Sequence, residues 1–309
     1  MKKTNLKQYI SYVKQQKNIS IEDELLEKDY MISLFLSTWK KQKENLSSLE
    51  HLIFKGGTLL SRNFLHYPRI SEDLDFTFDD SNRLRLVKSD TRREKEIKKL
   101  VIDIISDIKK ISKSSGFDFN VDRTDQKYIQ VRNSRAVYLF FLYYPSLLTG
   151  ELNSIKIEIN FLEHRFFDYI ENRIHTIIEP DLYLKSIGYN IENAVVKTYD
   201  LNEIILEKYR AILTRGPLKK RDILDLYFIH RNSKDVFTVD TQLIKQKIED
   251  SYLISPVAQT NFTKNIELIK QDTFGESDDR VEPLLLKKIE KEDFTIFQKE
   301  LLQKLKTII

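Results

Sequence analysis

Two of the seven glycines in this chain of 309 residues are adjacent, Gly56-Gly57, at a junction between two local patterns. The short apolar run at 51–54 is typical of a buried strand, and the segment at 58–65 has the pattern of a short helix. A chain that uses glycine so rarely and then doubles it needs unusual backbone geometry there. Amides at the start of a helix bind phosphate, which makes Gly56, Gly57 and Thr58 candidate phosphate contacts through their N–H groups. A glycine pair taken alone is also compatible with a simple turn.

The strand predicted at 74–78 carries the main acidic motif of the sequence. Asp73 and Asp75 are two residues apart, so on a strand both carboxylates point to one face. Neighbouring carboxylates repel each other and a divalent cation relieves that repulsion, so this pair suits Mg²⁺, with Mn²⁺ as the alternative. Glu158, on the polar face of the strand predicted at 154–161, would add a third carboxylate and allow a site for two metal ions. Most Asp-x-Asp pairs are solvated, however, and Glu158 alone fits any half-buried strand.

The periodicity of the apolar residues changes once along the chain, near residue 195. Strands and helices are mixed before it, and helical spacing dominates after it, where Asp200 with Glu203 three residues on predicts a helix start. We predict strands at 51–54, 74–78, 117–122, 136–144 and 154–161, and helices at 4–16, 21–44, 58–65, 92–114, 200–214, 219–231, 239–250, 258–271, 283–291 and 293–307. The expected fold is therefore α+β (mixed α/β). A domain with a small mixed sheet would span 1–195 and an α-helical bundle domain would span 196–309.

Composition excludes several classes of protein. The chain has no cysteine, which rules out disulfide scaffolds, thiolate metal sites and thiol nucleophiles. Its histidines show no spacing typical of metal ligands; they are His51, His66, His164, His175 and His230. The N-terminus lacks the apolar core of a signal peptide, and no run is long enough for a transmembrane helix. We therefore expect a cytoplasmic protein with no membrane partner.

The net charge of +4 is distributed unevenly. Residues 71–80 hold five acids and no base, while residues 81–99 carry a net +5 and residues 207–231 a net +4. Basic stretches of this kind can follow a phosphate backbone, although most basic helix faces are only solvated. The charge pattern therefore leaves nucleic acid open as a partner.

The stretch Phe54–Phe78, FKGGTLLSRNFLHYPRISEDLDFTF, resembles the signature of the AbiEii/AbiGii toxin family of nucleotidyltransferases, in the polymerase-β-like nucleotidyltransferase superfamily. The shared pattern is a glycine-rich turn, a short helix, an Asp-x-Asp strand and a carboxylate on a later strand. Three later segments are also similar to family motifs: Lys156-Ile157-Glu158, Glu207-Lys208-Tyr209-Arg210-Ala211 and Arg221-Asp222-Ile223-Leu224-Asp225-Leu226. Glu158 stands where the family has Asp, and Ile70 where it usually has Phe.

The resemblance implies a metal-dependent nucleotidyltransferase and a role for each matching residue. Asp73, Asp75 and Glu158 would hold the metal, with Glu158 alternatively acting as a base toward the incoming hydroxyl. Lys208 would meet the β- and γ-phosphates, unless it lies on a solvated helix face. Asp222 would orient Lys208, unless it belongs to a salt-bridge array within its own helix.

Three further residues near the acidic strand are candidate nucleotide contacts. Arg69 and Ser71 precede the strand and could reach the triphosphate, although Arg69 could instead pair with a neighbouring acid on the surface. Ser61, in the first turns of the short helix, is equally compatible with an ordinary polar position. Asp225, one helical turn beyond Asp222, is a secondary candidate.

The resemblance also suggests what such an enzyme does. It implies transfer of an NMP from an NTP to the 3′ end of tRNA, by the toxin of a toxin–antitoxin or phage-defence (abortive infection) system with a cognate antitoxin protein. Two alternatives stay open: transfer of NMP to a protein or small molecule, and a catalytically silent NTP-binding module.

Overall fold

The computed structural model describes residues 1–309 except 121–125, 134, 276 and 278–279. Its helices are α1 (Lys3–Lys17), α2 (Asp23–Lys41), α3 (Gly56–Leu59), α4 (Ser81–Arg85), α5 (Asp90–Ser115), α6 (Leu182–Ser186), α7 (Leu201–Thr214), α8 (Lys220–Asn232), α9 (Thr241–Ile254), α10 (Val257–Lys270) and α11 (Lys291–Ile308). Its strands are β1 (Leu52–Lys55), β2 (Asp73–Phe78), β3 (Ile129–Arg132), β4 (Val137–Pro145), β5 (Leu152–Asn160), β6 (Ile170–Arg173) and β7 (Val195–Thr198). This mixture of helices and strands confirms the mixed α/β prediction.

The described strands form one mixed sheet in the order β3-β4-β5-β2-β1-β7-β6. β2 lies in the middle, antiparallel to β1 and parallel to β5. The parallel pairing requires a long crossover, which α5 supplies between the two strands. β2 is therefore flanked by two strands that come from distant parts of the sequence.

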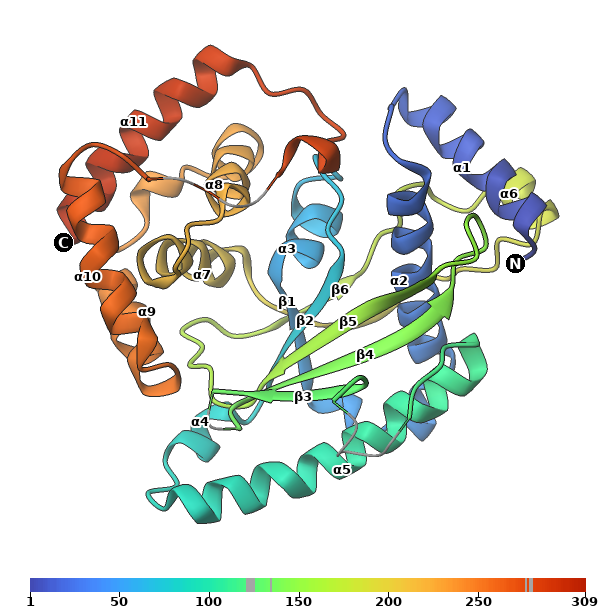
Figure 1. The fold of residues 1–309 in the computed structure, drawn as a ribbon, viewed down its shortest axis with the longest axis horizontal. Coiled ribbons are helices and arrows are strands. Elements are labelled where there is room, and N and C mark those ends of the chain that lie inside the picture. The colour runs from blue at the N-terminus through green and yellow to red at the C-terminus, as the bar shows by residue number, and fades with distance from the viewer. Residues whose placement is uncertain (121–125, 134, 276, 278–279) are drawn as a thin grey trace.

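Alternation along β2 gives the sheet two different faces. Leu74 and Phe76 are buried on one face, where Phe76 packs against Trp39 of α2 with ring centroids 5.6 Å apart. α5 lies alongside α2 on this side (Figure 1). Asp73 and Asp75 point to the opposite face of the sheet, so that face carries the candidate site.

The helices that follow β7 gather on one side of the sheet (Figure 1). α7 begins as predicted, because the Asp200 side chain accepts a hydrogen bond from the Asn202 amide. Glu203 does not complete a capping box: its carboxylate instead accepts from the amides of Phe166 and Phe167 and pairs with a lysine of α9. The acid at this position connects α7 to other parts of the chain rather than to its own first turn.

Several predicted elements were wrong. Residues 283–291 are not a helix: only a 3₁₀ turn at Glu282–Leu284 forms, and the chain then pairs with residues 68–70 through backbone hydrogen bonds such as Ile70 N–H to the Leu284 carbonyl. The expected strand at 117–122 contributes one isolated bridge, Asp118 to Tyr143, and its last two residues lie outside the described part of the chain. β3, β6 and β7 were missed because each has only four residues, at least two of them polar, whereas the equally short β1 is an apolar run.

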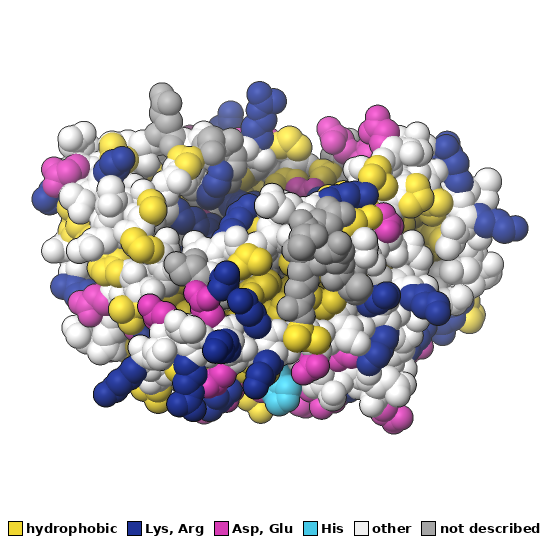
Figure 2. Space-filling model, turned by 60° about the horizontal axis from the view of Figure 1, so that its bottom comes forward, with side chains coloured by type: hydrophobic (Ala, Val, Ile, Leu, Met, Phe, Trp, Pro, Cys, Tyr) yellow, Lys and Arg dark blue, Asp and Glu magenta, His cyan; other side chains and the backbone are white. Residues whose placement is uncertain are grey.

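The basic stretch at 81–99 forms α4 and the start of α5, and its arginines are largely paired. Arg83 and Arg92 contact Glu96, Arg93 contacts Asp90, and Arg85 contacts an acid of α9. Figure 2 shows Lys, Arg and acidic side chains interspersed on the side of the molecule where α5 lies. Among the described residues, no helix combines the length and the apolar character needed to cross a bilayer.

Candidate active site

The strand register brings the predicted carboxylates together on the open face of the sheet. Asp75 of β2 lies opposite Glu158 of β5 and, on its other side, opposite Lys55 of β1. Asp73 lies opposite Lys156, whose Nζ is 2.9 Å from Asp73 Oδ2. Three carboxylates and two lysines from three neighbouring strands therefore share one patch.

The carboxylate of Asp75 carries the electrostatic cost of this arrangement. Burial, followed by the negative charges of Glu158 and Asp73, raises its pKa to about 7, although Lys156 and Lys55 oppose the shift. These two lysines thus offset only part of the repulsion. A bound divalent cation would offset the rest.

The chemistry of these donors fits a hard cation such as Mg²⁺, because carboxylate oxygens crowd together at a partly buried point. As the side chains stand, no group of three His, Asp or Glu residues among those described is arranged to hold a metal ion. One oxygen of Asp73 instead forms an ion pair with the Lys156 ammonium. Asp73, Asp75 and Glu158 remain the residues that would hold the ion, with a shift of Lys156 required.

The glycine pair shapes the edge of this patch. Gly56 has φ of +79°, and a side-chain Cβ there would lie 2.9 Å from the Cβ of Asp75 and overlap its carboxylate. A Cβ on Gly57 would lie 2.7 Å from Nη2 of Arg69 and 3.0 Å from Oγ of Ser71. Both positions therefore require glycine, one for conformation and space and the other for space alone.

Two of the predicted nucleotide contacts have a structural use for their side chains. The Thr58 hydroxyl donates to the Asp73 carbonyl, and the Ser61 hydroxyl donates to the Arg69 carbonyl. Both side chains are buried and neither lines the cavity described below. The structure thus turns Ser61 away from any nucleotide in the cavity and leaves Thr58 only its backbone for that role.

The opposite wall of the site comes from α7 and α8. Lys208 is buried, and its Nζ lies 2.7 Å from Asp222 Oδ1 and 2.6 Å from Asp225 Oδ2. Arg69 makes a bidentate contact with Asp225 at 2.8 and 2.9 Å, and Arg215 contacts Asp222 at 2.7 Å. The surface alternatives for Lys208 and Arg69 are therefore wrong, since both side chains belong to one buried network. Asp222 pairs with Lys208 of α7 and with Arg215 before α8, which are not residues of its own helix.

This network keeps its two aspartates ionised. Burial would raise the pKa of Asp222, but Lys208 and Arg215 outweigh it and hold the pKa well below its usual range. Burial likewise opposes the ionisation of Asp225, and Arg69 with Lys208 again lowers the pKa. The network consists of three cations and two anions, so it presents a net positive charge to the carboxylate patch.

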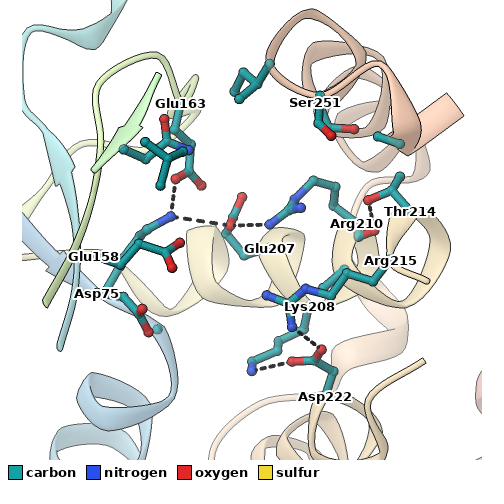
Figure 3. A pocket seen from close by; sticks show the side chains of 18 of the residues that line it. Asp75, Glu158, Glu163, Glu207, Lys208, Arg210, Thr214, Arg215, Asp222 and Ser251 are labelled. Atoms are coloured by element: carbon teal, nitrogen blue, oxygen red, sulfur yellow. Dashed lines mark hydrogen bonds and ion pairs between the residues drawn. The ribbon is translucent and has the colours of Figure 1, made fainter. Parts of the chain in front are cut away.

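A cavity of about 480 Å³ lies between the two walls. Figure 3 shows Asp75 and Glu158 on one side of it and Lys208 with Asp222 on the other. Its volume is in the range of small-molecule sites. Of the predicted site residues, those that line it are Gly56, Gly57, Arg69, Ser71, Asp73, Asp75, Glu158, Lys208 and Asp222.

Other charged residues that line the cavity were given no role from the sequence, although several of them stand in segments similar to family motifs: Lys55, Lys156, Glu163, Glu207, Arg210 and Lys247. Lys55 precedes the glycine pair and Lys156 is two residues from Glu158, so their positions beside predicted residues were the available signal. Glu163 and Lys247 gave no signal, because only the folded chain brings them to Lys55 and Glu207.

Comparisons with known proteins show the family and the fold of the chain. The family model "Nucleotidyl transferase AbiEii toxin, Type IV TA system" matches residues 44–307. The solved structure of MenT4, a nucleotidyltransferase toxin from Mycobacterium tuberculosis H37Rv, shares the fold with a TM-score of 0.57 at 13% identity, covering 96% of this chain and 89% of that one. JHP933 from Helicobacter pylori aligns with a TM-score of 0.45 at 16% identity, over 93% of this chain and 94% of its own.

No curated protein sequence matches the chain. The family match covers most of its length and includes both walls of the cavity. The chain belongs to the AbiEii family of nucleotidyltransferases, the toxins of type IV toxin–antitoxin systems.

Proposed function

We propose that this nucleotidyltransferase moves an NMP from an NTP to the 3′ end of a tRNA, with Mg²⁺ at Asp73, Asp75 and Glu158. The observation that carries the proposal is the cavity with a carboxylate wall from β2 and β5 and a cationic wall from α7 and α8. A nucleotide bound across it would place its α-phosphate by the carboxylates and its outer phosphates by Lys208. Mg²⁺ bound there would neutralise phosphate charge and orient the α-phosphate.

The residues of the chain then have separate tasks. The acceptor hydroxyl attacks the α-phosphorus in line, a new O–P bond forms, and pyrophosphate leaves as the bond to the bridging oxygen breaks. Glu158 has two carboxylate oxygens, so the oxygen that does not bind the ion can accept the proton of the hydroxyl. Lys208, oriented by Asp222 and Asp225, compensates the charge on the departing pyrophosphate.

An RNA acceptor is supported by the charge around the cavity. Of the two basic stretches, the one at 207–231 lines the cavity, through Lys208, Arg210, Arg215 and Arg221, whereas no residue of the stretch at 81–99 does. Arg215 keeps 42% of its side chain exposed although it pairs with Asp222. Cations at the edge of a cavity can contact the backbone of an RNA end that enters it. A cognate antitoxin is the partner that a type IV system implies.

The test supplies purified protein with Mg²⁺, each of the four α-labelled NTPs in turn, and total tRNA, beside the variant Asp73→Ala. We expect label in tRNA with the wild type and none with the variant, because the paired carboxylates have lost one member. Circular dichroism of the variant should match the wild type.

Other outcomes distinguish the alternatives. Label on protein rather than tRNA would indicate a protein acceptor. NTP binding without release of pyrophosphate under any acceptor would indicate a silent binding module. An Asp73→Ala protein with wild-type transfer would remove the carboxylate patch from the mechanism.

A further inference from the structure

Arg210 lines the cavity, and the transfer step described above assigns it no contact with the NTP. It lies on α7 two residues beyond Lys208, and its Nη2 is 2.8 Å from Glu207 Oε2. A guanidinium has five N–H donors. Among the described residues, Glu207 is the only carboxylate within ion-pair distance of it, so most of those donors are available to a ligand in the cavity.

A buried cluster holds Arg210 in place through Glu207. The other oxygen of Glu207 lies 2.8 Å from Nζ of Lys247 on α9, and Lys55 approaches Glu207 to 3.8 Å from the end of β1. Lys247 is itself fixed by Glu203, at 2.6 Å. Figure 3 shows Glu207 beside the guanidinium of Arg210. The guanidinium is thus preorganised by groups from β1, α7 and α9.

Arg210 has a larger capacity for phosphate than Lys208. An ammonium has three donors, and Lys208 directs two of them to Asp222 and Asp225. A guanidinium presents a planar fork that matches two oxygens of one phosphate. With 22% of its side chain exposed, Arg210 is accessible from the cavity.

We propose that Arg210 binds the β- and γ-phosphates of the NTP and stabilises the departing pyrophosphate, and that Glu207 is its positioning residue. This inference rests on the proposed NMP transfer, since it assigns a contact in the same site. When the bond between the α-phosphorus and the bridging oxygen breaks, the electron pair stays on pyrophosphate. Arg210 donates hydrogen bonds to that anion and no proton leaves the guanidinium.

The test compares Arg210→Gln and Arg210→Lys with Arg231→Gln, a control on α8 whose arginine makes a surface contact with Asp293 at 3.3 Å. Calorimetry measures binding of NTP, pyrophosphate and NMP, and kinetics give KM and kcat. We expect Arg210→Gln to weaken NTP and pyrophosphate binding about tenfold or more, the loss of one charge-assisted hydrogen bond, and to leave NMP binding unchanged. The affinity of Arg210→Lys for NTP and pyrophosphate should lie between those of the wild type and Arg210→Gln. Arg231→Gln should bind both as the wild type does.

Glu207→Gln tests the positioning role. It should raise the KM for NTP while leaving NMP binding as in the wild type, because the guanidinium loses its anchor but not its charge. Unchanged NTP and pyrophosphate binding in Arg210→Gln would overturn the inference, and so would an equal loss of NMP binding, which indicates a structural role only. A wild type that binds NTP and pyrophosphate but transfers nothing would instead contradict the proposed function and leave the Arg210 comparison interpretable.

Discussion

Single residues at the glycine turn show how local sequence and tertiary contact act together. The doubled glycine predicted special geometry, and the structure shows a positive φ at Gly56 with the Asp75 carboxylate in the space that a Cβ would take. The sequence alone could not reveal the second constraint, because Asp75 is nineteen residues away and meets Gly56 only through the pairing of β1 with β2. Gly56 is therefore required for two reasons, its positive φ and the close approach of Asp75, and an experiment can separate them.

A comparison of Gly56→Ala with Gly150→Ala distinguishes the effect of the positive φ from the effect of the close contact with Asp75. Gly150 has a similar φ of +83° but nothing within 4 Å of the position that a Cβ would take. Gly150→Ala should lower the free energy of unfolding by about 1–2 kcal/mol, the cost of a left-handed backbone. Gly56→Ala should cost more and should abolish NMP transfer, since Asp75 must move. Equal losses of stability with transfer intact in both variants would show that the carboxylate tolerates a methyl group.

At the scale of elements, local patterns predicted which segments form β2 and β5, whereas only the family resemblance implied that the two strands lie close together. Alternation placed Asp73 and Asp75 on one face of their strand, and Glu158 on the polar face of its own. The parallel pairing that brings Asp75 beside Glu158 depends on a crossover whose path no local pattern specifies. The same limit explains the wrong helix at 283–291, where the segment pairs with the backbone of residues 68–70 instead.

The pairing of β2 with β5 predicts a stability that depends on both pH and divalent cation. The pKa of Asp75 is raised to about 7, so its ionised form destabilises the fold, and stability should fall as pH rises from about 4 through 7. Mg²⁺ competes with that proton, so its stabilising effect should be larger at pH 8 than at pH 6. An ion at a hundred times its dissociation constant would add about 2.7 kcal/mol.

Thermal unfolding at pH 6 and pH 8, with and without Mg²⁺, measures this linkage. Asp75→Asn should remove part of the pH dependence and most of the Mg²⁺ effect, because the amide neither ionises nor ligates as a carboxylate does. A Mg²⁺ effect that is the same at both pH values, or that survives in Asp75→Asn, would place the ion elsewhere.

At the scale of the whole molecule, the site joins the sheet to the C-terminal helices. Arg69, which precedes β2, donates two hydrogen bonds to the Asp225 carboxylate of α8. The adjacent Ile70 amide donates to the Leu284 carbonyl. The cluster of Lys55, Glu207 and Lys247 makes a second connection between β1, α7 and α9. The family motif predicted Asp225 only as a secondary candidate, and its partner was beyond reach of the sequence because 156 residues separate them.

Asp225→Asn tests whether these connections make the sheet and the helices unfold together. The variant leaves the Arg69 guanidinium buried without its counter-charge, which should cost about 3–5 kcal/mol. Asp293→Asn is the matched control, since its contact with Arg231 is exposed and worth about 0–1 kcal/mol. Urea unfolding can be followed by circular dichroism for the helices and by the fluorescence of Trp39, the single tryptophan, for the sheet side.

The same unfolding experiment, repeated at different pH values, tests in which direction stability changes with pH. Arg69 and Lys208 lower the pKa of Asp225, so its contribution to stability is present above about pH 4 and is lost as the pH falls below that value. The wild type should therefore lose stability in acid more steeply than Asp225→Asn does. We expect both optical signals to change at one urea concentration in the wild type, and at one lower concentration in the variant. If the Trp39 signal kept its midpoint while the helical signal shifted, the Arg69–Asp225 contact would stabilise the helices alone, and the sheet with its carboxylates would fold independently of the wall that faces it.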